Sequence, residues 1–117
     1  PTAPMQQIQP HELAEWLGRQ RERGEGDAGI PLVLDVREDW ELRICRIDGS
    51  LHIPMQQVVQ RFDEIDRSRP IVCVCHHGMR SMQVAMFLQQ RGATRTYNLA
   101  GGIDAWARQV DPACALY

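Results

Sequence analysis

The chain has 117 residues, of which 44% are hydrophobic and 24% charged, so we expect one compact domain over residues 1–117, with its core at about residues 5–110. Its formal net charge is −2 and the acidic and basic residues interleave, which leaves no broad basic face for a nucleic acid partner. All thirteen basic residues are arginine, and the absence of lysine excludes Schiff-base chemistry, pyridoxal enzymes and phosphate-binding P-loops.

The first predicted elements are a short strand and an amphipathic helix. We expect a brief strand at residues 6–8. After a proline that suits the first turn of a helix, Leu13, Trp16 and Leu17 recur at helical spacing. Glycines are then concentrated in residues 24–31, which we interpret as a flexible link within the same domain.

Strands and helices alternate through the rest of the chain. Parallel neighbouring strands need a crossover, which is usually a helix, so this alternation predicts a parallel sheet covered on both faces and an α/β fold. The nearly continuous apolar run at residues 71–75 is typical of a strand buried on both faces. Strands are predicted at residues 32–36, 51–53, 71–75 and 96–99, and helices at residues 40–44, 55–65, 81–91 and 103–110.

Polar and glycine residues follow the predicted strands. Open parallel sheets bind their ligands beyond the carboxyl ends of the strands, so we expect these residues to meet at one edge. They are Asp35 and Arg37 after one strand, Cys75 after the next, and Asn98 with the Gly101 and Gly102 pair after a third.

The stretch CHHGMRS, residues 75–81, carries the strongest chemical signal. A cysteine at a strand tip, followed by a tight loop and by a helix near Ser81, lets several main-chain N–H groups point at the sulfur and at an anion beside it. Gly78 permits the turn, and Arg80 adds a permanent positive charge. Helix N-termini and cations favour the thiolate form of a cysteine. We therefore infer that Cys75 is a nucleophile rather than a packing residue.

The remaining cysteines predict no disulfide framework. Cys73 shares a strand face with Cys75 near the upper limit of disulfide spacing, so we expect it to be a small buried hydrophobic residue. Cys114 is expected to be an unpaired surface thiol. Few, unevenly placed cysteines, no secretory signal and no apolar run of bilayer length favour a reducing, cytoplasmic location with no membrane partner.

Four motifs together resemble one known family. The pattern C-x-x-G-x-R-S begins at Cys75, and it is accompanied by LDVRE at residues 34–38, HIP at residues 52–54 and YNLAGGIDAW at residues 97–106. In this order and over nearly the whole chain, they resemble the single-domain rhodaneses, a family of sulfurtransferases. The resemblance implies a three-layer α/β/α fold with a five-stranded parallel sheet.

The resemblance also implies a reaction in two steps. The Cys75 thiolate attacks the outer sulfur of a small anionic donor such as thiosulfate, sulfite leaves, and the cysteine holds a persulfide. A thiophilic acceptor, either cyanide or a cellular thiol such as that of a thioredoxin-like protein, then removes the sulfur. No metal or organic cofactor is implied. The expected substrate-binding residues are His76, His77, Gly78, Met79 and Arg80, and the expected supporting residues are Asp35, Arg37 and Ser81.

This sequence departs from the family pattern at two places. Family members usually carry glycine and histidine where this chain has Cys45 and Arg46 before Ile47, which places a second thiol near the expected pocket. The adjacent histidines at positions 76 and 77 are also uncommon, so substrate preference is not transferred from any one relative.

Three alternative functions remain open from the sequence. A metal site at Cys75, His76 and His77 lacks the second ligand pair that usually completes a tetrahedral site. A related cysteine phosphatase would need a loop one residue longer than the C-x4-R found between Cys75 and Arg80. A persulfide carrier or non-catalytic docking module would keep the same fold, and in the docking case Cys75 would have no reaction to perform.

Overall fold

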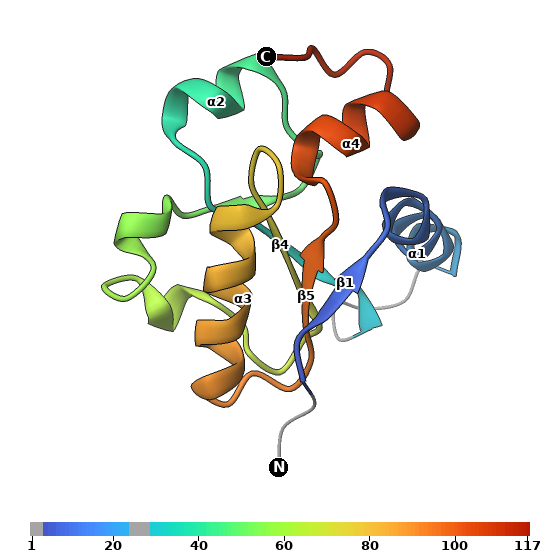
Figure 1. The fold of residues 1–117 in the computed structure, drawn as a ribbon. Coiled ribbons are helices and arrows are strands. Elements are labelled where there is room, and N and C mark those ends of the chain that lie inside the picture. The colour runs from blue at the N-terminus through green and yellow to red at the C-terminus, as the bar shows by residue number, and fades with distance from the viewer. Residues whose placement is uncertain (1–3, 24–28) are drawn as a thin grey trace.

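A computed structural model describes residues 4–23 and 29–117 (Figure 1). Five parallel strands form one sheet in the order β1-β5-β4-β2-β3, which confirms the predicted fold class. Most of the predicted link at residues 24–31 lies outside the described residues. The strands are β1 (Gln6–Ile8), β2 (Leu32–Asp35), β3 (Leu51–His52), β4 (Ile71–Val74) and β5 (Thr96–Leu99), and the α-helices are α1 (Pro10–Arg23), α2 (Asp39–Ile44), α3 (Met79–Gln90) and α4 (Gly102–Gln109).

Helices cover both faces of the sheet, as expected for three layers (Figure 1). Along the central strand β4, Cys73 packs with Val84 and Leu88 of α3 in one hydrophobic cluster. Val72 and Val74 face the opposite side and pack with α1 and α4. The strands β2 and β4 are buried at every position, which explains the apolar sequence of β4 and of β2 up to Asp35.

The predicted helix at residues 55–65 is wrong. Two 3-10 helices, η2 (Met55–Gln57) and η3 (Phe62–Glu64), lie there instead, separated by turns. The apolar residues that the two turns bury, Val58 and Ile65, lie three residues after Met55 and Phe62. A spacing of three fits a 3-10 turn as well as an α-helix, so the hydrophobic pattern alone could not separate them.

The central crossover brings a helix N-terminus directly to the end of β4. Helix α3 begins at Met79, two residues before the predicted start, after Gly78 in the left-handed region with φ of +104°. The fold therefore places residues 75–78 as a four-residue connection between a buried strand and a helix.

Of the helices in the described part of the chain, none combines the length and the apolar character that crossing a bilayer would need.

Candidate active site

The sulfur of Cys75 lies at the end of β4, under the first turn of α3. The Gly78 N–H donates a hydrogen bond to Cys75 Sγ at 3.1 Å, and Ser81 Oγ lies 3.2 Å from the same sulfur. The Cys75 residue is only 1% exposed. The short connection thus folds back over the sulfur and encloses it.

Fewer main-chain N–H groups donate to this sulfur than the sequence predicted. We expected several N–H groups around it, whereas Gly78 supplies the one main-chain hydrogen bond to Cys75 Sγ found among the described residues. Helix α3 has no side-chain cap at its N-terminus. Because the first N–H groups of a helix have no partner within it, this uncapped end can stabilise an anion beside the sulfur.

Asn98 connects the sulfur, the loop and the sheet. Ser81 Oγ lies 2.5 Å from Asn98 Oδ1, and Asn98 Nδ2 donates to the Gly78 carbonyl at 3.0 Å and to Gln7 Oε1 at 3.1 Å. The Ser81 hydroxyl has a single proton, which it can donate either to Asn98 or to Cys75 Sγ. A negative charge on the sulfur would therefore compete for that proton.

The N-terminus of α4 holds the other side of the loop. The N–H of Ile103 donates to the Cys75 carbonyl at 2.8 Å, and the N–H of Asp104 donates to the His76 carbonyl at 3.1 Å. Gly102 lies against these carbonyls with φ of +65°, and a Cβ at this position would collide with both of them. The Gly101 and Gly102 pair is therefore a packing surface for the loop as well as a turn.

The two cysteines of this strand differ in their surroundings. Cys73 is fully buried in the hydrophobic core, as predicted, and burial raises the pKa of its thiol well above the usual range. Cys73 and Cys75 are both free thiols. Only Cys75 has hydrogen-bond donors beside its sulfur among the described residues, so the two thiols do not share the same potential chemistry.

Arg80 is paired with a carboxylate that the sequence did not single out. Its guanidinium makes two hydrogen bonds with Glu41, at 2.8 and 3.0 Å, and its side chain remains 36% exposed. Burial raises the pKa of Glu41, but the hydrogen bonds from Arg80 and Tyr117 outweigh this effect and lower the pKa to about 2. Part of the Arg80 charge is therefore neutralised inside the protein.

Asp35 and Arg37 form a buried ion pair behind the site. The Arg37 guanidinium donates to Asp35 Oδ2 at 2.7 Å and to the Cys45 carbonyl at the same distance, and it also reaches the Tyr117 hydroxyl. Among the described residues, no hydrogen bond joins either side chain to Cys75. Their contacts order the chain between β2 and the end of α2.

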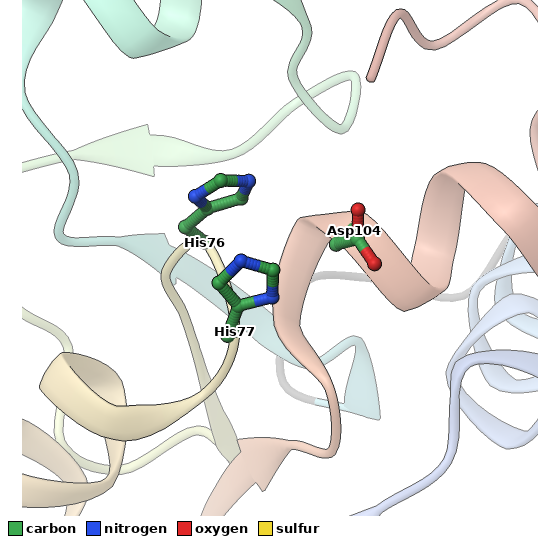
Figure 2. A group of neighbouring side chains, drawn as sticks. All are labelled: His76, His77 and Asp104. Carbon is green, nitrogen blue, oxygen red and sulfur yellow. The ribbon is translucent and has the colours of Figure 1, made fainter. Parts of the chain in front are cut away.

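The loop residues His76 and His77 lie beside α4, with His77 exposed and His76 half-buried, its Nε2 enclosed by the protein (Figure 2). Their rings are stacked with centroids 3.9 Å apart, and their ligand atoms lie within 4.8 Å of those of Asp104. Cys75 is not part of this group. The two imidazole rings are stacked on each other, and Asp104 is already paired with Arg108 at 3.0 Å, so a metal would require these contacts to rearrange.

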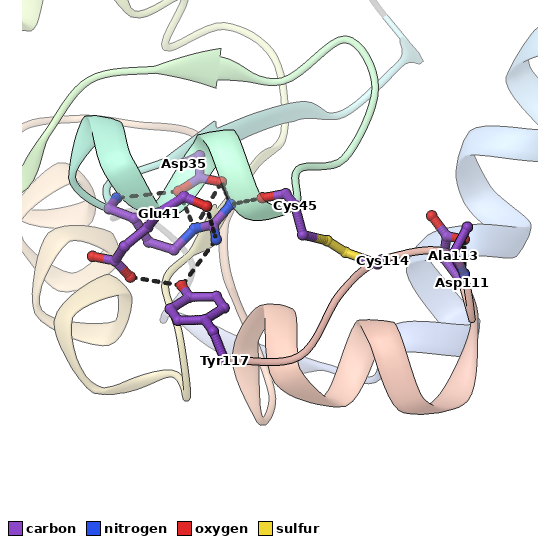
Figure 3. The surroundings of a disulfide bond; sticks show 8 residues. Asp35, Glu41, Cys45, Asp111, Ala113, Cys114 and Tyr117 are labelled. Atoms are coloured by element: carbon purple, nitrogen blue, oxygen red, sulfur yellow. Dashed lines mark hydrogen bonds and ion pairs between the residues drawn. A yellow bond between two sulfur atoms is a disulfide. The ribbon is translucent and has the colours of Figure 1, made fainter.

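The expectation for Cys114 is wrong. Cys114 is buried and forms a disulfide with Cys45, with Cα atoms 5.1 Å apart (Figure 3). The Tyr117 hydroxyl donates to Glu41 Oε2 at 2.6 Å, and its ring stacks on His76 with centroids 3.9 Å apart. The segment that follows α4 therefore reaches the candidate site.

The structure brings the expected residues together unevenly. Cys75, Gly78 and Ser81 meet at the sulfur, whereas Met79 is 69% exposed and His77 lies on the surface. Glu41 and Tyr117 were missed as site residues. The spacing of Glu38 and Glu41 carries the local signal of a helix capping box, but nothing near Tyr117 in the sequence indicates its partners.

Comparison with known proteins agrees with this arrangement. The family model described as Rhodanese-like domain matches residues 10–109. A protein named sulfurtransferase from Allochromatium vinosum is 39% identical over 84 residues, which cover 72% of this chain and 78% of that protein. The thiosulfate sulfurtransferase GlpE of Actinobacillus pleuropneumoniae is 28% identical over 102 residues, which cover 87% of this chain and 86% of that protein.

A solved structure extends the likeness to three dimensions. The rhodanese-related protein from Thermoplasma volcanium superposes with a TM-score of 0.73 at 28% sequence identity. The match covers 90% of this chain and 93% of that chain.

Proposed function

This chain belongs to the rhodanese-like domain family of sulfurtransferases, and from that premise we propose that Cys75 carries a sulfane sulfur between two substrates. The thiolate attacks the outer sulfur of an anionic donor such as thiosulfate and forms a sulfur–sulfur bond. The donor's own sulfur–sulfur bond breaks, and sulfite leaves with that electron pair. A thiolate or cyanide then attacks the outer sulfur of the persulfide and restores the Cys75 thiolate.

One observation carries this proposal above the others. The sulfur at position 75 accepts a main-chain hydrogen bond from Gly78 beneath a helix N-terminus that has no side-chain cap. The donor, the leaving sulfite and the persulfide are all anions, and preorganised N–H groups stabilise developing negative charge without reorganising. The same few donors can therefore serve both steps of the transfer.

The other site residues support the proposal in different ways. Ser81 offers a second donor to the sulfur, and Asn98 fixes Ser81 and Gly78 relative to each other. We assign His76, His77 and Met79 to the outer wall that the donor meets first, because His77 and Met79 are exposed and His76 lies next to Cys75 in the loop, in the stack with His77. Arg80 contributes a positive field near the pocket, reduced by its pairing with Glu41.

We place this activity in the cytoplasm with a small anionic donor and a thiol acceptor, free or on a thioredoxin-like protein. Thiol acceptors are kept reduced there, and the Cys45–Cys114 disulfide would make this chain an exception among cytoplasmic proteins, in which disulfides are rare. No metal or organic cofactor takes part in the proposed steps.

The phosphatase alternative is less well supported, because a phosphoryl group needs a guanidinium fork that is free to bind it. In this chain the fork of Arg80 is already engaged by Glu41. Hydrolysis of an aryl phosphate in the absence of sulfur transfer would reverse this ranking.

Intact-protein mass spectrometry after incubation with thiosulfate tests the proposal. We expect a species heavier by one sulfur atom, which cyanide removes with formation of thiocyanate. Cys75→Ser should form no such species, whereas Cys73→Ala, a matched control two positions earlier on the same strand, should still form it. A sulfur adduct that persists in Cys75→Ser would contradict the assignment of the nucleophile, and no adduct in any variant would favour a docking module.

A further inference from the structure

The segment that follows α4, residues 111–117, lies across the candidate site and is called the strap below. It begins with a turn in which the N–H of Cys114 donates to the Asp111 carbonyl at 3.0 Å and the N–H of Ala113 donates to Asp111 Oδ1 at 3.1 Å (Figure 3). From there the strap runs toward α2 and the connection between β4 and α3 (Figure 1). Nothing in the proposed sulfur transfer uses it.

The ring of Tyr117 holds the first part of the loop. It lies on the ring of His76 with centroids 3.9 Å apart and an angle of 6° between the planes. His77 stacks on the other side, so His76 is held between two rings. Because His76 is covalently joined to Cys75, this stack restrains the residue next to the sulfur.

The hydroxyl of Tyr117 holds the end of the loop through a carboxylate. It donates to Glu41 Oε2 at 2.6 Å and accepts from the Arg37 guanidinium at 2.9 Å. Glu41 in turn holds Arg80 in the first turn of α3. One side chain of the strap is therefore connected to both ends of residues 76–80.

The disulfide between Cys45 and Cys114 ties the strap to the end of α2. Tyr117 follows only three residues later. Its ring packs partly against the hydrophobic cluster that contains Cys114 and edge-on against Trp40, whereas Leu116 beside it is 51% exposed. Isolated stacking pairs and hydrogen bonds contribute modestly to stability. The covalent link is thus the strongest single restraint on where Tyr117 lies.

We propose that Tyr117 is a positioning residue for the Cys75 loop and that the Cys45–Cys114 disulfide is a redox-sensitive tether that keeps it in place. A dithiol reductant opens the tether by thiol–disulfide exchange. The dithiol loses two electrons and two protons and becomes a disulfide, while Cys45 and Cys114 each become a thiol. The freed strap then leaves the loop, and the sulfur of Cys75 becomes more accessible.

This inference rests on the proposed sulfur transfer for its role, but its test does not require sulfur transfer. In a cytoplasmic protein a disulfide is typically transient or redox-sensing, which suits a tether that responds to thiols. The thiols that serve as sulfur acceptors belong to the same chemical class as the reductants that open the tether. A rise in thiol concentration would thus both supply the sulfur acceptor and open the disulfide that holds the strap.

The test is the rate at which iodoacetamide alkylates Cys75, followed by peptide mass spectrometry on the full chain. Relative to the oxidised protein, we expect the rate to rise about tenfold after reduction by a dithiol, in Cys45→Ser/Cys114→Ser and in Tyr117→Ala, because each releases the loop to open locally. Tyr117→Phe, which keeps the ring stack, should lie between these and the oxidised protein. Leu116→Ala, an exposed neighbour on the strap, should leave the rate unchanged.

The outcomes separate the two parts of the argument. An unchanged rate in Tyr117→Ala overturns the positioning role. An unchanged rate on reduction and in the double serine variant, with circular dichroism showing both folded, overturns the tether. An equal increase in Leu116→Ala also overturns the proposal, because the effect would then not depend on Tyr117. None of these results bears on whether Cys75 transfers sulfur.

Discussion

The Cys75 loop and the strap meet at one place but are held there by different forces. The loop is fixed through its own main-chain carbonyls, which accept from the N–H groups of Ile103 and Asp104 and from the Asn98 side chain. The strap is fixed by one covalent bond and by the ring and hydroxyl of Tyr117. The part that we assign to chemistry is thus built into the backbone, whereas the part that we assign to control depends on replaceable side chains.

The largest effect should come from breaking the backbone support of the loop. Gly102→Ala forces a side chain into the left-handed region and against the carbonyls of Cys75 and His76. We expect a loss of about 3 kcal/mol in the free energy of unfolding, measured by urea denaturation, and loss of sulfur loading on Cys75.

The matched control for this substitution is Gly92→Ala. Gly92 also has a positive φ, +94°, but no atom lies within 4 Å of the position that its Cβ would take. Only the conformational cost, about 1 kcal/mol, should appear. Equal losses in the two variants would contradict close packing at Gly102.

A smaller effect is expected from the hydroxyl that links the sulfur to the sheet. Ser81→Ala removes the partner of Asn98 Oδ1 in a buried position and should lower the free energy of unfolding by about 2 kcal/mol. It should also slow persulfide formation, because the sulfur loses one of its two donors. Ser68→Ala, at an exposed turn, should change neither quantity. If persulfide formation is unaffected in Ser81→Ala, the hydroxyl has only a structural role.

The contribution of Glu41, which links Arg80 to Tyr117, to stability should be lost in acid. The pKa of Glu41 is lowered from its usual value of 4.5 to about 2, so its contribution to stability is complete above pH 4.5 and is lost as the pH falls toward 2. Glu41→Gln should be less stable than the native protein by about 1 kcal/mol at pH 7, since its partner Arg80 is partly exposed. The difference should shrink through that acidic range.

Thermal unfolding measured between pH 2 and pH 7 checks this prediction. Glu15→Gln is the matched control, because Glu15 is an exposed helix carboxylate paired with Arg19 at 4.0 Å only. A difference for Glu41→Gln that stays constant with pH would show that its carboxylate is not ionised against Arg80.

An effect of similar size, but in the alkaline range, is expected from the hydroxyl of Tyr117. Burial and the hydrogen bond to Glu41 raise the pKa of Tyr117 from 10 to about 12, so its contribution to stability is complete below pH 10 and is lost as the pH rises toward 12. Tyr117→Phe should cost about 1 kcal/mol at pH 7 and flatten the alkaline loss of stability. Tyr97→Phe, which removes the hydroxyl of the other tyrosine in the chain, serves as the control. An identical alkaline profile in Tyr117→Phe would place the hydroxyl outside the network.

Local patterns predicted most of the elements and the position of Cys75 because their signals lie within a few residues. The strands at residues 71–74 and 96–99 and the helices beside them follow from apolar runs and helical spacing. The position of Cys75 at a strand tip before a helix follows from the same stretch. The error at residues 55–65 arose where that spacing fits two kinds of helix.

The network around the strap could not be predicted from such patterns. Cys45 and Cys114 are 69 residues apart in sequence, and Tyr117 lies 76 residues from Glu41. Contacts between residues so far apart depend on how the layers pack, which no local spacing records. Arg80 illustrates the same limit, since its charge was predicted but its partner was not.

The hydrogen bonds from α4 to the loop carbonyls also fix the direction of the N–H groups in the same peptide units. All peptide bonds in the described residues are trans, so the carbonyl and the N–H of one peptide unit point in opposite directions. With the carbonyls of Cys75 and His76 turned toward α4, the N–H groups of His76 and His77 must be directed away from it. The planarity of the amide, rather than any side chain, therefore sets the direction of these N–H groups. Replacing His76 or His77 by another residue would change the shape of the surface there but not the direction in which the N–H groups point.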